Sequence, residues 1–355
     1  MTIEAGLLLP PPHVISARVF MHHSNEEENL SRFEDIPDDI ARSIFELAAE
    51  ERNVACHCAV ASRKIKAWVE PVLYRRIAID SPSRMANLHR TIRCHPSKGP
   101  KFFSSNVKAL YIDWQVPWGF FTNLIRACQS VEKLEIHFRL PYDGSIQKIA
   151  NLGLGWKAIR PRMLLLPMLL FKPAYRHFRC GVQGEIEDQH LHRTLFSNVT
   201  HLELVVHGTL RATEWDWTSL AQLETLTHLC LSTSTMYEEC AVAAQQHLAL
   251  ATASFPPSLI VCVVSFLILK GEWPGVRKML DESEWSGDGR VVVAVGKHAY
   301  DAELAKEGGE IAWVGRKVIW RWPYHYEHID DDGWISFWMR AEGKVIEMTR
   351  ARTNA

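Results

Sequence analysis

The sequence predicts an α/β fold, in which a small helical module is followed by an irregular solenoid with parallel strands. Two observations support this prediction. Residues 33–76 show the three- and four-residue apolar spacing of short amphipathic helices. After residue 76, one short apolar pattern recurs at intervals that are typical of a repeat array.

Composition narrows the class of protein. The chain has 355 residues, of which 47% are hydrophobic and 23% charged, as in ordinary globular proteins. Its formal net charge is −1, so no basic surplus points to nucleic acid or to an acidic membrane surface. The eight cysteines show no disulfide framework, which favours a reducing compartment. We therefore expect an intracellular protein, cytoplasmic, nuclear or both, with no nucleic-acid or membrane partner.

Residues 1–32 are predicted to form a disordered tail. Three prolines at 10–12 and a polar stretch at 22–29 cannot build a core. The tail has no basic n-region, so we expect no signal peptide. The longest apolar runs, at 163–171 and 259–269, are too short to cross a bilayer.

The helical module begins with the acidic, proline-bearing start Ile36-Pro37-Asp38-Asp39. Ile40, Ile44 and Leu47 follow at intervals of four and three, which places them on one helix face. Forty-odd residues of small helices make a thin core, so apolar surface should remain uncovered. Uncovered apolar surface of this kind needs a partner.

This order of residues resembles the F-box family. The positions that match are Ile36-Pro37, Ile44-Phe45, Val60 with Ser62-Arg63, Trp68 and Leu73-Tyr74-Arg75. The sequence departs from the family in an extra Ala61 and in cysteines at 56 and 58, where leucines are usual. The resemblance implies that the module docks on a Skp-family linker protein of a cullin–RING ubiquitin ligase. The residues implied in docking are Ile36, Pro37, Ile40, Ile44, Phe45, Val60 and Trp68.

The repeating pattern reads apolar, two variable, apolar, one variable, apolar, as in VKALYI and VEKLEI. Such alternation is typical of a short strand with one buried face. The expected strands are centred on residues 110, 134, 178, 202, 229 and 262. Helix-like stretches lie between them at 120–128, 162–171 and 240–251. The array resembles degenerate leucine-rich repeats; a generic α/β fold with a parallel sheet is the alternative.

The carboxyl-terminal part changes character. Residues 290–295 read as one more strand, and 312–322 are aromatic and basic. A polar, acidic loop at 325–333 precedes an amphipathic helix at 333–341, placed to cap the solenoid. We therefore expect four segments. They are the tail 1–32, the helical module 33–80, the solenoid 81–285, and the last strand with its Trp-rich cap 286–355.

The sequence shows no catalytic constellation, so we predict no catalytic residue, metal or cofactor. Cys56-His57-Cys58 is interpreted as two buried thiols flanking an exposed histidine, because neighbouring helical residues do not converge on a metal. Gly153-Leu154-Gly155 is interpreted as a loop, and the acidic triplet 330–332 as a helix start. The tryptophans are expected mainly to fill the core and the cap.

Module and repeats together resemble F-box-like proteins with degenerate leucine-rich repeats, of the kind found in mushroom-forming fungi. That resemblance implies a substrate receptor, which binds an unknown target protein through the solenoid. Strand residues between the buried positions should then point outward into solvent. The candidates for target binding are Tyr111, Asp113, Glu135, His137 and Glu203, with Val205 beside them. A scaffold that no longer binds the linker, or a hydrolase in the carboxyl-terminal third, are the alternatives.

Overall fold

The structure is a computed structural model in which only part of the chain is described. The described residues are 36–113, 118–137, 159–168, 195–206, 212, 217–233, 238–266, 287–298, 300–301, 318–321 and 331–354. Several expectations lie outside them: the tail at 1–32, the glycine loop at 153–155, the strand centred on 178 and the acidic loop at 325–330.

Three short helices form the amino-terminal part. They are α1 (Asp38–Ala48), α2 (Arg52–Ala61) and α3 (Arg63–Leu73). Asp38 and Asp39 lie in the first turn of α1, where their negative charge interacts favourably with the positive end of the helix dipole. The Ser62 hydroxyl caps α3 by accepting the Ile65 backbone N–H at 3.1 Å. The helices close on a small core of Ala49, Ala55, Val69 and Val72.

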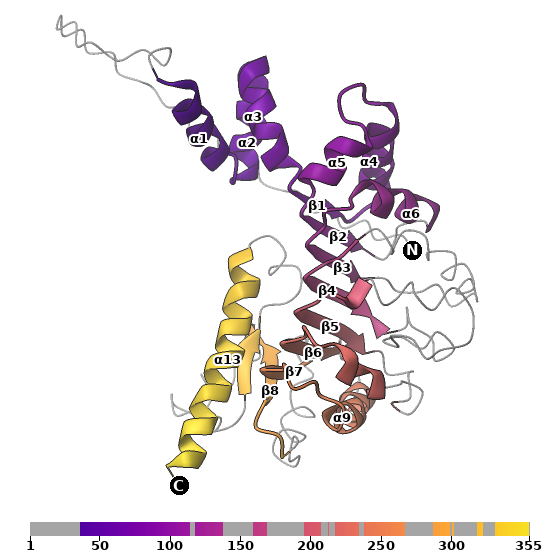
Figure 1. The fold of residues 1–355 in the computed structure, drawn as a ribbon, viewed down its shortest axis with the longest axis vertical. Helices are drawn as coiled ribbons and strands as arrows, with labels where there is room; N and C mark the ends of the chain where they lie inside the picture. The colour runs from indigo at the N-terminus through magenta and orange to yellow at the C-terminus, as the bar shows by residue number, and fades with distance from the viewer. Residues whose placement is uncertain are drawn as a thin grey trace, which may run out of the picture.

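After these helices the described strands form one nine-stranded sheet (Figure 1). Every strand is parallel to its neighbour, and the strand order follows the sequence from β1 to β9. The strands are β1 (Arg76–Ile79), β2 (Ala109–Asp113), β3 (Lys133–His137), β4 (Met163–Pro167), β5 (His201–Val206), β6 (His228–Thr233), β7 (Val261–Phe266), β8 (Val291–Gly296) and β9 (Val318–Arg321). The molecule is therefore a mixed α/β structure with an all-parallel sheet.

The strands predicted around residues 110, 134, 202, 229 and 262 are confirmed as β2, β3, β5, β6 and β7, and the strand at 290–295 as β8. The helix expected at 162–171 is wrong, because Met163–Pro167 is strand β4. Its residues are apolar on both faces, and such a run carries no alternation that separates strand from helix. β1 and β9 were not predicted; β1 lies within the segment assigned to the helical module.

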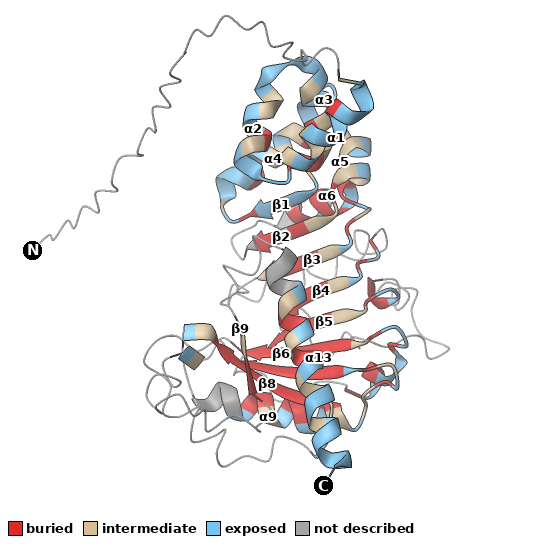
Figure 2. Cartoon of the chain, turned by 90° about the vertical axis from the view of Figure 1, so that its left-hand side faces the viewer, coloured by how far each residue is buried: buried red, intermediate tan, exposed pale blue. Residues whose placement is uncertain are grey.

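Helices cover one face of the sheet. They are α4 (Pro82–Cys94), α5 (Pro100–Asn106), α6 (Trp118–Ala127), the 3-10 helix η8 (Trp217–Gln222) and α9 (Glu238–Thr252). α6 and α9 confirm the helices predicted at 120–128 and 240–251. Between helices and sheet lies the main core, which contains inward strand residues such as Leu110, Leu134, Leu202 and Leu229 (Figure 2).

Helix α13 (Asp331–Thr353) packs on the opposite face of the sheet (Figure 1). A second apolar cluster joins Phe337, Trp338 and Ala341 of α13 to β6, β7, β8 and β9. The predicted helix at 333–341 is confirmed, but it is longer than expected and crosses the strand face. No helix among the described residues is long and apolar enough to cross a membrane.

Candidate functional site

Large apolar side chains are exposed on α1 and α2. The exposed fractions are 50% for Ile40, 50% for Ile44, 76% for Leu47 and 83% for Val60. We call these four residues, together with the exposed Pro37, the module patch. Single exposed apolar residues are ordinary, but a group on two short helices indicates a contact surface.

These side chains are exposed because small residues form the contacts between the helices. Ala41, Ala49 and Ala55 are buried, so the helices approach each other through small side chains and leave the large ones outside. The predicted partner-binding residues Ile36, Phe45 and Trp68 are half-buried, and the Phe45 and Trp68 rings lie 6.3 Å apart. Leu47 was not among the candidates, although its position on the same stripe as Ile40 could have identified it.

A largely buried ion pair joins the helical module to the link between α4 and α5. The Lys98 ammonium, in the link between α4 and α5, lies 2.8 Å from a Glu70 carboxylate oxygen of α3. It also donates to the Tyr74 hydroxyl at 3.2 Å. Burial disfavours the charged ammonium, but the hydrogen bonds to Glu70 and Tyr74 outweigh this, so the pKa of Lys98 lies above its ordinary value. The module therefore has a defined orientation relative to β1.

The strand face of β2 and β3 brings several predicted target-binding residues together. The Tyr111 and His137 rings lie 4.9 Å apart, and Lys133 contacts the Glu135 carboxylate at 3.0 Å. His137 Nε2 lies 3.6 Å from the same carboxylate. Asp113 is opposite His137 in the β2–β3 register. Tyr111, Lys133, Glu135 and His137 therefore form a compact polar group on two neighbouring strands.

The expectation that these positions point into solvent is wrong for three residues. Glu203 is 0% exposed, and Glu135 and Val205 are also buried. Their side chains do alternate with the inward leucines, as predicted. Glu203 is buried because Arg321 of β9 and the Phe337 ring of α13 cover it, whereas Glu135 on β3 lies between Lys133 and His137. Tyr111 and His137 remain partly exposed.

Glu203 forms a buried ion pair with Arg321 of β9. Two guanidinium nitrogens donate to the two carboxylate oxygens at 2.9 Å each. The same guanidinium lies 3.6 Å from Cys230 Sγ and 3.5 Å from Ser265 Oγ, and it stacks 4.5 Å from the Phe337 ring of α13. Two charges are tolerated here because each is paired and hydrogen-bonded.

Two histidines stack beneath α13. The His201 and His228 rings of β5 and β6 are 4.0 Å apart and nearly parallel, and the Trp338 ring meets both edge-on at 5.4 and 5.0 Å. His228 Nε2 lies 2.7 Å from Glu342 Oε1 of α13. The Thr227 hydroxyl lies 2.7 Å from the other ring nitrogen, Nδ1. We call His201, His228, Trp338 and Glu342 the histidine cluster.

Burial lowers the pKa of both histidines. Desolvation, then His228 and then Arg162 lower the pKa of His201 to about 3. Desolvation also lowers the pKa of His228, although the hydrogen bond and charge of Glu342 oppose the change. Both rings therefore favour the neutral form while α13 is docked.

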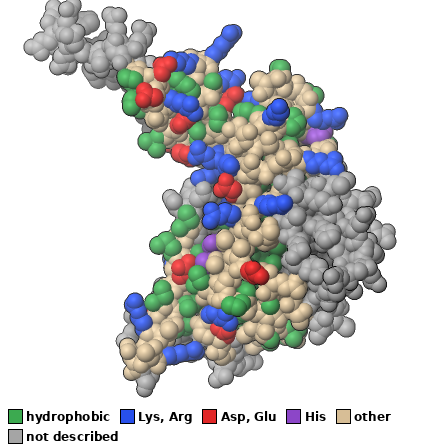
Figure 3. Space-filling view, in the orientation of Figure 1, with side chains coloured by type: hydrophobic (Ala, Val, Ile, Leu, Met, Phe, Trp, Pro, Cys, Tyr) green, Lys and Arg blue, Asp and Glu red, His purple; other side chains and the backbone are tan. Residues whose placement is uncertain are grey.

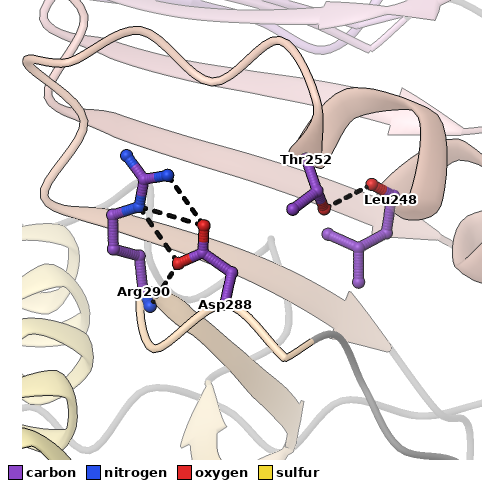
Figure 4. A network of polar contacts seen from close by, with 4 residues as sticks. All are labelled: Leu248, Thr252, Asp288 and Arg290. Atoms are coloured by element: carbon purple, nitrogen blue, oxygen red, sulfur yellow. Dashed lines mark hydrogen bonds and ion pairs between the residues drawn. The ribbon is translucent and has the colours of Figure 1, made fainter.

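The entrance to β8 carries a third polar contact. Figure 4 shows the Asp288 carboxylate accepting hydrogen bonds from the Arg290 side chain, with a shortest distance of 2.7 Å. The Arg290 backbone N–H donates to the same carboxylate at 2.8 Å, and the hydrogen bond to Asp288 raises the pKa of Arg290. In the same view the Thr252 hydroxyl donates to the Leu248 carbonyl near the end of α9 at 2.7 Å. These hydrogen bonds stabilise local turns of the backbone and do not indicate a catalytic or binding role.

Cys128 and Cys262 are buried free cysteines. Burial raises the pKa of Cys128 to about 12 and also raises that of Cys262. The expectation that Cys56 and Cys58 are both buried is wrong: Cys56 is exposed and Cys58 half-buried, because α2 turns Ala55 into the core. In the described part of the chain, no three His, Cys, Asp or Glu residues are placed to hold a metal ion.

No protein-family model matches the chain, and no curated protein matches it.

Proposed function

We propose that this chain is an F-box-like adaptor of a cullin–RING ubiquitin ligase. Helices α1 to α3 dock on a Skp-family linker, and the repeats, in the manner of leucine-rich repeats, hold a target protein. The exposure of the module patch carries this proposal, because a small helical module with four exposed large apolar side chains needs a partner. Figure 3 shows hydrophobic side chains among charged ones on this module.

The sheet supports the second half of the proposal. The strands follow one another in sequence order and the helices described between β1 and β7 lie on one face, as expected for a solenoid of strand–helix units. The Lys98–Glu70 pair joins the module to this array in one orientation. A fixed orientation of the module relative to the repeats is useful to an adaptor. The adaptor's contribution is to raise the effective concentration of target lysines near the loaded ubiquitin carrier.

The test is the affinity of the purified full chain for the linker protein. Ile40→Asp combined with Pro37→Ala places a carboxylate in the docking surface, and burying that unpaired charge should weaken binding by roughly 100-fold or more. Leu250→Asp on α9 is the matched control, because it introduces the same charge at an exposed leucine far along the sequence. Circular dichroism checks that both variants fold.

Unchanged linker affinity in the Ile40→Asp, Pro37→Ala variant would contradict docking through α1. A wild-type chain that shows no affinity for the linker would favour the scaffold alternative.

A further inference from the structure

We propose that α13 is an autoinhibitory cover, whose release uncovers the strand face of β5 to β7. This inference rests on the proposed function, in which the strand face binds the target. It also explains why one predicted recognition residue, Glu203, is buried beneath Arg321 and the Phe337 ring of α13.

The two faces of the sheet differ in chemistry. The face under the other helices is apolar in β2 to β8, with Leu, Ile, Val and Cys at the inward positions. The opposite face is mixed: Cys230 of β6 and Val261 and Val263 of β7 are apolar and pack under α13, whereas other positions of β2, β3 and β5 to β7 carry polar and charged side chains. These are Tyr111, Lys133, Glu135, His137, His201, Glu203, His228, Ser232 and Ser265. Polar groups are costly under a permanent cover and inexpensive on a surface that meets water or a ligand. The polar positions of β5 and β6, which lie beside the apolar cluster, are therefore the part of this face suited to binding a ligand.

Helix α13 is held over this face by one stripe of residues, in which Val345 and Met348 pack against the same cluster as the buried ones. Phe337, Trp338 and Ala341 are its buried residues within 335–354, where side-chain burial is described. Ile335, Met339 and most of 346–354 are exposed (Figure 2). A helix held along one stripe, from Phe337 to Met348, can be released without breaking the main core, which lies on the other side of the sheet.

The histidine cluster makes this attachment sensitive to protonation. Two protonated rings 4.0 Å apart would repel each other beneath Trp338. Glu342 of α13 favours a proton on His228, whereas Arg162, before β4, disfavours one on His201.

Other charges near the cluster already have partners. Glu203 is paired with Arg321, and Glu135 of β3 with Lys133. The pKa of each histidine is lowered, so docking is complete above about pH 6.5, the ordinary histidine value, and weakens as the pH falls below it.

Cysteines provide the readout in the full chain. Cys230 of β6 lies in the cluster under α13, whereas Cys262 of the neighbouring strand faces the main core. Exposed Cys56 serves as a reference for reagent reactivity at each pH. Pulse labelling with N-ethylmaleimide, followed by peptide mapping, therefore separates release of α13 from global unfolding.

Trp338→Ala should raise the labelling rate of Cys230 relative to Cys56 at least tenfold at pH 7.5, while Cys262 stays protected. Glu342→Ala, which removes a half-exposed side chain, should have the same effect to a smaller degree. Met339→Ala is the matched control, since that side chain is exposed, and should change nothing. In the wild type, the ratio of Cys230 to Cys56 labelling should rise from pH 7.5 to 5.5.

A synthetic peptide of residues 331–354 provides the complementary arm. Added to the Trp338→Ala chain, it should restore protection of Cys230, and the same peptide with the Trp338→Ala change should not. The proposal is overturned if Cys230 stays protected in both variants, if Cys230 and Cys262 become labelled together, or if the peptide restores nothing. Linker affinity is measured on the same samples. A wild-type chain that does not bind the linker would count against the adaptor function and not against release of α13.

Discussion

Removing Arg321 should destabilise the fold strongly, because it leaves the Glu203 carboxylate buried without its charged partner. The pair is fully buried and bidentate, with two N–O distances of 2.9 Å. Breaking a buried pair by removing one partner costs about 3–5 kcal/mol. Arg321→Met keeps a side chain of similar length and removes the charge. With a denaturant slope of about 3 kcal/mol per molar urea, the unfolding midpoint should fall by about 1–1.7 M.

The double variant Glu203→Leu with Arg321→Met provides the control for this prediction. Replacing both charges by apolar groups removes the unpaired carboxylate, so its stability should lie within about 1 kcal/mol of the wild type or above it. The single variant should also lose less stability at pH 5 than at pH 8, because burial raises the pKa of an unpaired carboxyl group and protonation relieves it. A single variant as stable as the wild type, or a double variant as unstable as the single one, would refute the reasoning.

Three further predictions concern the core, the histidine cluster and the attachment of the module. Leu202→Ala should cost about 2–5 kcal/mol in urea unfolding, because Leu202 is fully buried between β5 and the helices; a cost below about 1 kcal/mol would contradict its place in the main core. His201 has a pKa lowered to about 3, so stability should fall as the pH drops from 6.5 towards 3, and His201→Phe should flatten that dependence in urea midpoints measured across this range. Lys98→Met should remove the nearer cation of the partly buried Glu70, leaving Lys66 at 3.7 Å, and cost about 1–3 kcal/mol, with increased hydrogen exchange at the α3–β1 junction; unchanged exchange would argue against a fixed module.

The sequence predicted the strands whose pattern reports a single buried face. Leu110 and Ile112, or Leu202 and Leu204, alternate with polar neighbours, and β2 and β5 lie where this alternation placed them. Strand β4 was missed because Met163–Pro167 is apolar throughout and periodicity does not separate such a strand from a helix. Strand β9 was missed because it is four residues long and ends in a charged arginine.

The exposure of Ile40 and Ile44 could also be predicted, since a forty-residue helical module has too little core to cover them. The burial of Glu203 could not. Its partner Arg321 is 118 residues away, and its cover comes from the far end of the chain. Alternation along a strand shows which side chains share a face, but it does not show whether another element covers that face. This is why the prediction for Glu135, Glu203 and Val205 was correct in direction and wrong in exposure.

Hydrogen exchange of the full chain, with and without a Skp-family linker protein, tests the central claim most directly. The account predicts that the linker slows exchange in peptides from α1 to α3, which contain the module patch, and leaves those from α9 and α13 unchanged. No protection anywhere, or protection confined to the sheet or to α13, would contradict the proposal that this chain docks on a ubiquitin ligase through its helical module.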